Sequence, residues 1–169
     1  MMKPIFLLLC VILVSCKSTS TDTTDETKKI NTILDEWHGA AARANFDNYF
    51  QYFSEDAVFI GTDATENWHK KEFGAFAKPY FDKGKAWSFT PLERHIFFDK
   101  NTQTAWFDEL LNTQMKICRG SGVLEKINNE WKIKQYVLSM TMPNDKIEDV
   151  LKLKSVEEDS IIRTLQKKY

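Results

Sequence analysis

The sequence predicts an α+β fold in which an antiparallel sheet curls around a long amphipathic helix. Helical patterns dominate as far as Gly84, and strand patterns separated by turns fill residues 86–140. A block of helices followed by a run of strands is typical of the α+β class. The first helix has a single apolar face, so the strands must wrap that face to bury it.

The first two helices are recognised by the spacing of their apolar residues. Residues 28–44 repeat apolar side chains at the helical period, namely Ile30, Ile33, Leu34, Trp37 and Ala41. Asn45 is a suitable N-cap for a second, short helix. The apolar stripe of that helix consists of Phe46, Tyr49, Phe50 and Phe53.

A buried strand and a third helix follow. Residues 57–60 are all apolar and end at Gly61, which predicts a buried strand. Residues 68–81 are predicted to be helical. Pro79 is expected to kink or end this helix, because proline lacks the backbone donor that a helix interior needs.

The second half of the chain has the alternation of strands joined by tight turns. Strands are expected at residues 87–89, 94–98, 105–111, 117–127 and 131–140. Residues 99–102 are predicted to form a turn. Asn128–Asn129 suits a hairpin, since asparagine tolerates the left-handed backbone conformation. Residues 145–169 are expected to be a helical extension with a capping box at residues 155–158.

The first sixteen residues are typical of an exported protein. Lys3 precedes an apolar run, Ile5–Val14, which is too short to span a bilayer but has the length of a secretory signal core. The segment Leu13-Val14-Ser15-Cys16 resembles the lipobox of bacterial lipoproteins. This resemblance implies that residues 1–15 are a signal peptide and that Cys16 is lipidated. Several acyl chains on Cys16 would hold the protein firmly.

The lipobox therefore implies a protein of the bacterial cell envelope, lipid-anchored to a membrane on its non-cytoplasmic side. Residues 16–27 are expected to be the lipidated cysteine and a flexible tether, because residues 18–27 include no apolar side chain. An ordinary secretory signal is the alternative. Cys10 is a poorer lipidation site, since the bulky Leu9 precedes it.

Composition narrows the function further. The chain of 169 residues has a net charge of −1, which argues against a nucleic-acid partner, because such partners favour a basic face. Apart from Cys10 and Cys16, the chain has one cysteine, Cys118, so neither a disulfide framework nor a cysteine-based metal site is expected. His38, His69 and His95 do not have the spacing of metal ligands. We expect no metal and no cofactor.

Several segments carry a family resemblance. They are the amphipathic first helix and residues 53–59, 61–68, 105–109, 118–124 and 131–136. Together they resemble a SnoaL-like domain of the nuclear-transport-factor-2-like (NTF2-like) superfamily, expected over residues 28–144. The resemblance implies a cone, in which a curved sheet wraps the helices and leaves a pocket at its wide end. The superfamily includes cyclases, isomerases, dehydratases and binding modules, so the fold alone does not choose an activity.

Two adjacent carboxylates are the first candidates for the pocket. Asp108 and Glu109 lie on one strand, so their side chains point to opposite faces and one of them must point into the cone. Arg119 on the neighbouring strand is the expected partner of that inward carboxylate. The pair would then be a ligand-orienting or acid–base site, or simply a cross-strand ion pair.

Aromatic residues are the second set of candidates. Trp68, Trp87 and Trp106 are expected to form apolar pocket walls, with ordinary core packing as the alternative. Tyr136 either donates a hydrogen bond to a ligand or, because it alternates with lysines, faces outward at a homodimer contact.

Two functions remain open from the sequence. The first is a membrane-anchored domain whose cone binds a small apolar ligand or a partner. The second is a cofactor-free lyase or isomerase that uses a carboxylate acid or base in the same pocket. The sequence does not identify catalytic residues, because it lacks a nucleophile elbow, a glycine-rich phosphate loop and an HExxH motif.

Overall fold

A computed structural model describes residues 22–168, so the predicted signal peptide and Cys16 lie outside the described residues. The elements follow the chain as α1 (Thr24–Ala42), α2 (Phe46–Phe50), β1 (Phe53–Ile60), β2 (Asn67–His69), α3 (Lys70–Asp82), β3 (Thr90–Phe98), β4 (Thr104–Thr113), β5 (Lys116–Ile127), β6 (Glu130–Met140), the 3₁₀ helix η1 (Asn144–Lys146) and α4 (Ile147–Gln166). This order confirms the α+β class.

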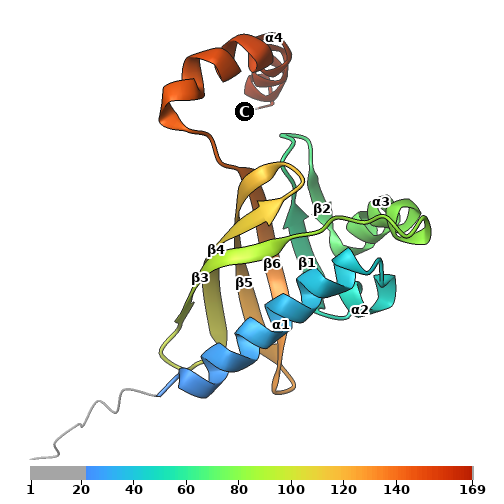
Figure 1. The fold of residues 1–169 in the computed structure, drawn as a ribbon, viewed down its shortest axis with the longest axis vertical. Coiled ribbons are helices and arrows are strands. Elements are labelled where there is room, and N and C mark those ends of the chain that lie inside the picture. Colours follow the sequence, from blue (N-terminus) through green and yellow to red (C-terminus); the bar gives the residue numbers. More distant parts are fainter. Residues whose placement is uncertain (1–21, 169) are drawn as a thin grey trace, which may run out of the picture.

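One curved sheet holds six strands in the order β2-β1-β6-β5-β4-β3 (Figure 1). Strands β3 to β6 pair antiparallel through short turns, as predicted. Strand β1 instead runs parallel to β6, so the prediction of a purely antiparallel sheet is wrong. The two strands lie far apart in the sequence, and only a long connection of this kind allows parallel pairing.

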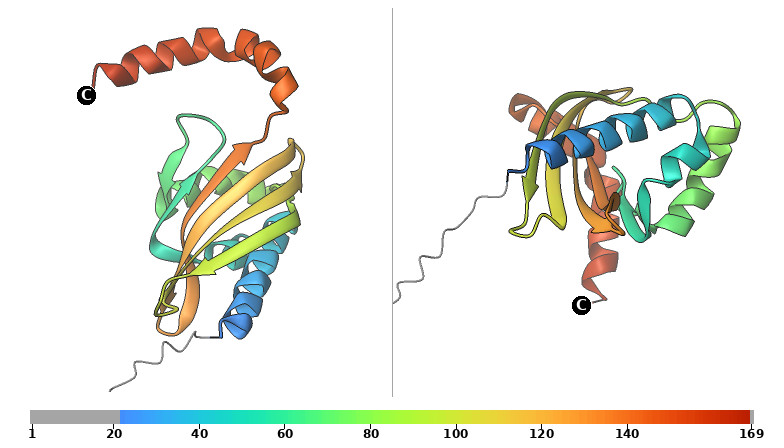
Figure 2. Two further views of the ribbon diagram at one scale, coloured as in Figure 1. Left: turned by 90° about the vertical axis from the view of Figure 1, so that its left-hand side faces the viewer. Right: turned by 90° about the horizontal axis from the view of Figure 1, so that it is seen from below.

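Helix α1 crosses the inner face of the sheet and covers it (Figures 1 and 2). Its buried residues include Ile30, Leu34, Trp37 and Ala41, as the helical periodicity predicts. Beside it, Phe50 of α2 and Phe73 and Phe81 of α3 are part of the core. The core therefore lies between one helix face and the concave side of the sheet.

The turns follow the sequence signals. Asn128 and Asn129 adopt φ values of 50° and 66°, which confirms the predicted hairpin. Asp99 accepts backbone hydrogen bonds from Gln103 and Thr104 at 2.8 and 2.9 Å, and so closes the predicted turn. The Asn45 side chain accepts from the backbone of Asn48 and caps α2, as expected.

Two segments differ from the predicted secondary structure. Trp68 lies in strand β2 opposite Phe59, rather than in a helix. Helix α3 starts only after His69, whose backbone N–H donates to the Glu72 carboxylate at 3.2 Å. The predicted strand at residues 87–89 is not formed, and β3 starts at Thr90. Local periodicity could not distinguish these cases, because the pairing partner of each segment decides them.

Helix α1 begins at Thr24, so the last four residues of the predicted tether are helical. Glu26 explains the extension, since its carboxylate fixes the first turn to the sheet. It accepts a 2.6 Å hydrogen bond from Trp131 Nε1 and forms a 3.0 Å ion pair with Lys126. Lys29, one turn further along α1, also contacts it at 2.9 Å.

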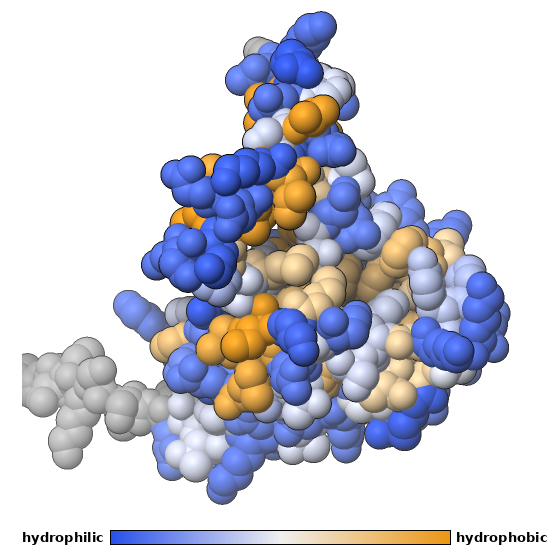
Figure 3. Space-filling view, turned by 45° about the horizontal axis from the view of Figure 1, so that its top comes forward, coloured by the Kyte–Doolittle hydropathy of each residue, from blue (hydrophilic) through white to orange (hydrophobic). Residues whose placement is uncertain are grey.

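Helix α4 leaves the end of β6 and stands apart from the rest of the domain (Figures 1 and 2). It runs unbroken through Ser155, whose hydroxyl bonds to the carbonyl of Leu151, so the predicted capping box is wrong. No residue of α4 is buried. Figure 3 shows hydrophobic side chains exposed along it and a hollow in the domain beneath. Across residues 22–168, no helix is long and apolar enough to cross a membrane.

The contacts of Glu26 predict a dependence of stability on pH. Hydrogen bonds from Lys29 and Trp131 lower the pKa of Glu26 from 4.5 to about 2. A carboxylate whose pKa is lowered by folding stabilises the fold above its unfolded pKa, and this contribution is lost as the pH falls toward the folded value. Glu26→Gln should therefore lower the melting temperature at pH 7, and the difference from wild type should shrink between about pH 5 and pH 2.

Circular-dichroism melts across this pH range test the prediction. Asp25→Asn is the matched control, because Asp25 lies in the same helical turn but is solvent-exposed. A difference between Glu26→Gln and wild type that stays constant from pH 7 to pH 2 would contradict the assigned role of Glu26.

Candidate functional site

The pleat of β4 separates the two adjacent carboxylates, as predicted. Glu109 points inward and is 0% exposed, whereas the Asp108 side chain points outward and is 37% exposed. The inward carboxylate lies at the centre of the domain, between α1 and the sheet.

Glu109 accepts hydrogen bonds from three elements. Its Oε1 accepts from His38 Nε2 at 2.8 Å and from the Tyr136 hydroxyl at 3.0 Å. Its Oε2 accepts from Arg94 Nε at 2.9 Å and lies 2.8 Å from Arg94 Nη2. A buried carboxylate is tolerated only when its oxygens are paired in this way. We call Glu109, His38, Arg94 and Tyr136 the central polar cluster.

Backbone register brings these side chains together. Arg94 and Glu109 are direct cross-strand partners on β3 and β4. On the other side, Glu109 faces Gly120 of β5. A Cβ atom on Gly120 would lie 2.1 Å from the Tyr136 hydroxyl oxygen and 3.0 Å from Glu109 Cγ. A glycine inside a strand often marks such a close approach, and this signal in the sequence could have revealed the cluster.

The pKa shifts within the central polar cluster show which of its groups are charged. Burial by itself raises the pKa of Glu109, but the hydrogen bond from His38 and the charges of His38 and Arg94 outweigh burial and leave that pKa below its usual value. Burial, together with the charge of Glu109, raises the pKa of Tyr136 well above its usual value. Glu109 is therefore an anion and Tyr136 a neutral donor near pH 7.

Arg119 is not the partner of the inward carboxylate, so that prediction is wrong. Its side chain is 54% exposed on the outer face of the sheet, where Nη1 lies 3.7 Å from Asp108 Oδ1. His95 also contacts Asp108, at 3.2 Å. These outer residues form the cross-strand ion pair that was the alternative interpretation. Arg94 takes the inner position because the β3–β4 register places it opposite Glu109.

Trp106 is likewise not a pocket wall. It shares the outer face with Asp108, is 47% exposed and stacks on Phe97 with ring centroids 6.0 Å apart. Residues two apart on a strand point to the same face, so the assignment of Asp108 to the outer face also decides that of Trp106.

Tyr136 points inward because β6 contains a bulge. Val123 and Leu124 on β5 are consecutive, but their partners Gln135 and Ile133 on β6 are two residues apart. The extra residue reverses the alternation along β6, so that Tyr136 is fully buried. The outward orientation of Tyr136, one of the two sequence interpretations, is therefore wrong.

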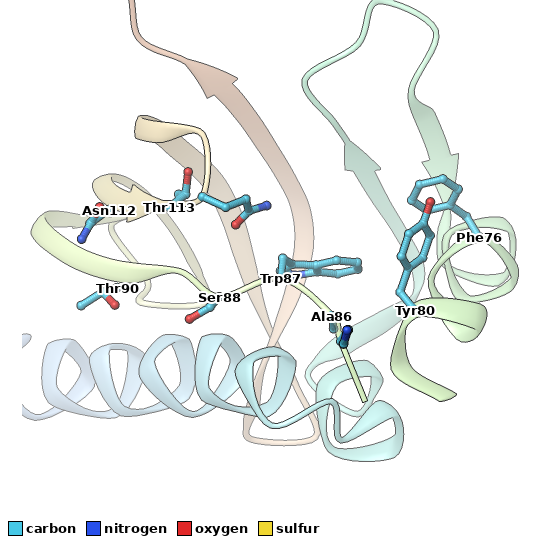
Figure 4. A pocket seen from close by; sticks show the side chains of 10 residues that line it. Phe76, Tyr80, Ala86, Trp87, Ser88, Thr90, Asn112 and Thr113 are labelled. Atoms are coloured by element: carbon cyan, nitrogen blue, oxygen red, sulfur yellow. The ribbon is translucent and has the colours of Figure 1, made fainter. Parts of the chain in front are cut away.

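Trp68 and Trp87 do lie at the wide end of the cone, beside an aromatic cavity of about 180 Å³. An open depression of about 680 Å³ adjoins this cavity (Figure 4). Phe76, Trp87 and Gln114 line both. We call the two together the cone mouth. Its remaining lining residues are Phe59, Gly61, Thr62, Glu66, Phe73, Tyr80, Lys85, Ala86, Ser88, Phe89, Thr90, Asn112, Thr113, Met115 and Leu138.

The central polar cluster does not line the cone mouth; aromatic rings that line the mouth lie against it. The ring of Phe89 lies 5.8 Å from that of His38, and the ring of Phe59 lies 5.7 Å from that of Tyr136. The polar groups that do line the mouth are amides and hydroxyls, together with Glu66 and Lys85. Across residues 22–168, no three His, Cys, Asp or Glu side chains are arranged to hold a metal ion.

Comparison with protein-family models identifies the family of this domain. A family model for the SnoaL-like domain matches residues 30–143. The chain belongs to the SnoaL-like domain family. No curated protein matches it.

Solved structures place this SnoaL-like domain among NTF2-like folds. One is an NTF2-like protein of unknown function from Pseudomonas putida KT2440, with a TM-score of 0.62, 11% identity, and coverage of 73% of this chain and 92% of that one. Another is a candidate dehydratase of the NTF2-like family from Streptomyces avermitilis, with a TM-score of 0.61, 10% identity, and coverage of 71% and 99%. At these identities the likeness shows the fold alone.

The central polar cluster predicts opposite outcomes for the two neighbouring carboxylates. Glu109→Gln removes the buried counter-charge of Arg94, whose side chain is only 6% exposed, and leaves it with the exposed carboxylate of Asp35 at 2.9 Å. Breaking a buried ion pair in this way costs about 3–5 kcal/mol of stability. Asp108→Asn changes an outer-face residue and should alter stability by no more than about 0.5 kcal/mol.

Urea unfolding of both variants measures this difference. Because Asp108 and Glu109 are neighbours in one strand, each variant is the other's control. Equal stabilities of the two variants would contradict the structural role of Glu109.

Proposed function

We propose that this SnoaL-like protein is a binding module held at a bacterial membrane through lipid on Cys16, and that its cone mouth binds a small apolar ligand. The observation that carries the proposal is that no residue of the central polar cluster lines the cone mouth. The buried carboxylate is saturated by its own partners, and aromatic residues make up half of the lining of the smaller cavity.

The chemistry of the cone mouth suits a flat apolar molecule. The rings of Trp68 and Phe76 stack 4.5 Å apart, and those of Trp68 and Phe73 stack 5.7 Å apart. Ligand sites are typically apolar with a few polar groups that orient the ligand. Asn112 and Gln114, on the rim of the depression, supply amide groups for that purpose.

The alternative function, a cofactor-free lyase or isomerase, has less support. General acid–base catalysis needs a titratable group within hydrogen-bond reach of the substrate. Both Glu109 oxygens are already occupied, and neither Glu109 nor His38 lines the cavity. Glu66 does line it, but its Oε2 accepts a hydrogen bond from the Asp63 backbone N–H at 3.2 Å within the β1–β2 connection. The name of the Streptomyces avermitilis dehydratase describes that protein, which shares 10% identity with this chain. We therefore propose binding as the function.

The membrane part of the proposal rests on the Leu13–Cys16 segment, which resembles a lipobox. It includes the expected location in the bacterial cell envelope, on the non-cytoplasmic side of a membrane. A homodimer stays a prediction, and the exposed Phe97–Trp106 stack on the outer face of the sheet is the surface on which a second copy would pack.

Ligand binding is tested with a neutral aromatic probe, indole, titrated by calorimetry into protein produced without residues 1–21. Phe76→Ala should weaken binding about tenfold, because an aromatic contact contributes about 0.5–1.5 kcal/mol beyond its buried area. Phe97→Ala is the matched control. The two side chains are similarly exposed, Phe76 at 39% and Phe97 at 46%, but Phe97 lies on the outer face of the sheet.

Saturable binding that only Phe76→Ala weakens would support the proposed site. If wild type binds no indole, or if both variants weaken binding equally, the cone mouth is not the binding site.

Lipidation is tested by feeding the expressing bacterium an alkyne-labelled fatty acid. Wild type should incorporate the label and fractionate with membranes, whereas Cys16→Ala should lose the label, because the thiol is the attachment atom. Cys10→Ala is the control and should behave as wild type. Label retained by Cys16→Ala, or lost from Cys10→Ala, would refute the assignment of Cys16.

A further inference from the structure

Helix α4 has an apolar side that no other element among residues 22–168 buries. Ile147, Leu151, Ile162 and Leu165 are between 43% and 51% exposed, and no residue of the helix is buried. Most helical stability in proteins comes from packing an apolar face, so a helix of 20 residues that stands alone lacks its main support. The match to the SnoaL-like family ends at residue 143, before α4 begins, so the family does not account for this helix.

The apolar residues of α4 follow the helical period. At about 3.6 residues per turn, most of them share one side of the helix. Lys154 and Glu158 lie on the same side, midway along the helix, and contact each other at 2.8 Å while they stay 41% and 42% exposed. This side is therefore apolar at both ends and charged in the middle. We call its apolar members the α4 stripe, namely Ile147, Val150, Leu151, Ile161, Ile162 and Leu165.

The α4 stripe is symmetric about Val156. Apolar residues stand nine, six and five positions before Val156, and apolar residues stand nine, six and five positions after it. Lys154 precedes Val156 by two positions and Glu158 follows it by two, so opposite charges take mirror positions. In a twofold-symmetric contact, residue i of one copy meets residue j of the other and j meets i. Two copies of α4 therefore present matching residues to each other when they run in opposite directions.

Charge favours this antiparallel direction. In an antiparallel pair centred on Val156, Ile147 lies opposite Leu165, and Lys154 of each copy lies opposite Glu158 of the other. Each ammonium group then lies between two carboxylates, one from its own chain and one from the second copy. A parallel pair would place like charges opposite each other, which is costly at an interface.

The charged centre also disfavours the other surfaces that could cover α4. Insertion into lipid, or into the aromatic cone mouth of the same chain, would take Lys154 and Glu158 out of water without a new polar partner. A second α4 supplies opposite charges at this position and apolar side chains at both ends. A second copy of the chain is therefore the occupant that matches the whole side of the helix.

We propose that α4 pairs with α4 of a second copy, antiparallel about a twofold axis at the level of Val156, and so joins two chains into a dimer. The helix has 20 residues and is about 30 Å long, so the two domains attach at opposite ends of the pair. This contact is separate from the Phe97–Trp106 surface. It depends neither on the ligand of the cone mouth nor on lipid at Cys16.

Cysteine cross-linking in cells that express the full chain tests the arrangement. A chain with both Ile147→Cys and Leu165→Cys should give a covalent dimer with a short bismaleimide, because the two positions face each other across the antiparallel pair. Either change alone should give none, since the two copies of one position would lie about 27 Å apart along the helices. The same distance prevents a cross-link within one helix. Wild type gives the background, and its Cys118 is buried.

Charge variants of the double-cysteine chain test the centre of the pair. Lys154→Glu or Glu158→Lys should each reduce the covalent dimer roughly fivefold or more, because like charges then face each other twice. Coexpression of the two variants with different affinity tags should restore a dimer that carries both tags, since opposite charges face each other again. Lys152→Glu is the matched control. It makes the same change of charge at a side chain that is 71% exposed and lies away from the α4 stripe, so the dimer should persist.

The outcomes separate this pairing from its alternatives. Absence of a covalent dimer, or a dimer that Glu158→Lys leaves unchanged, would overturn the proposal. Because α4 contributes no buried residue, these variants should keep the domain folded, and circular-dichroism melts check this. A dimer formed by Ile147→Cys alone would show parallel helices and refute the antiparallel arrangement.

Two further variants identify the contact if α4 does not pair with itself. Loss of the dimer on Trp106→Ala, with no effect of Glu158→Lys, would place the contact on the outer face of the sheet. Tyr80 is 48% exposed and lines the cone mouth. A cross-link within one chain between Leu165→Cys and Tyr80→Cys, in place of a dimer, would show that α4 covers its own cone mouth and would refute the pairing.

Discussion

The buried carboxylate of Glu109 is the constraint on which the rest of the structure depends. It connects α1 through His38, β3 through Arg94 and β6 through Tyr136. An ionised group at the centre of a domain is tolerated only if each oxygen is paired, so these elements must meet at one point. The same requirement explains why Gly120 has no side chain, since any other residue would collide with the Tyr136 hydroxyl.

The closed polar centre separates the two ends of the domain. At the wide end, aromatic rings separate the carboxylate from solvent and form the walls of the cone mouth. At the other end, Glu26 fixes the first turn of α1 to the ring of Trp131. Glu109 and Glu26 are thus both engaged in structural contacts.

The orientation of a site residue was predictable from the sequence only where it depends on a single strand or helix. The pleat places Asp108 and Glu109 on opposite faces whatever the rest of the chain does, so one inward carboxylate was certain. The partner of Glu109 depends on which residue of β3 lies opposite, and the register selects Arg94 rather than Arg119. The bulge in β6 reverses the expected alternation, and no local pattern announces it. Trp106 lies two residues before Asp108 on the same strand, so once Asp108 points outward, Trp106 does too and cannot line the pocket.

The sequence by itself determined the α+β class, the amphipathic face of α1, the hairpin at Asn128–Asn129 and the resemblance to SnoaL-like domains, because periodicity, turn chemistry and family motifs are local properties. Only the tertiary structure decided that β1 pairs parallel to β6, that α1 begins at Thr24, and that Glu109 is enclosed by His38, Arg94 and Tyr136. These depend on contacts between residues up to about a hundred positions apart, such as Glu26 with Trp131. Burial and pairing of charges are decided where such distant segments meet, because the free energy of a charge depends on everything that surrounds it.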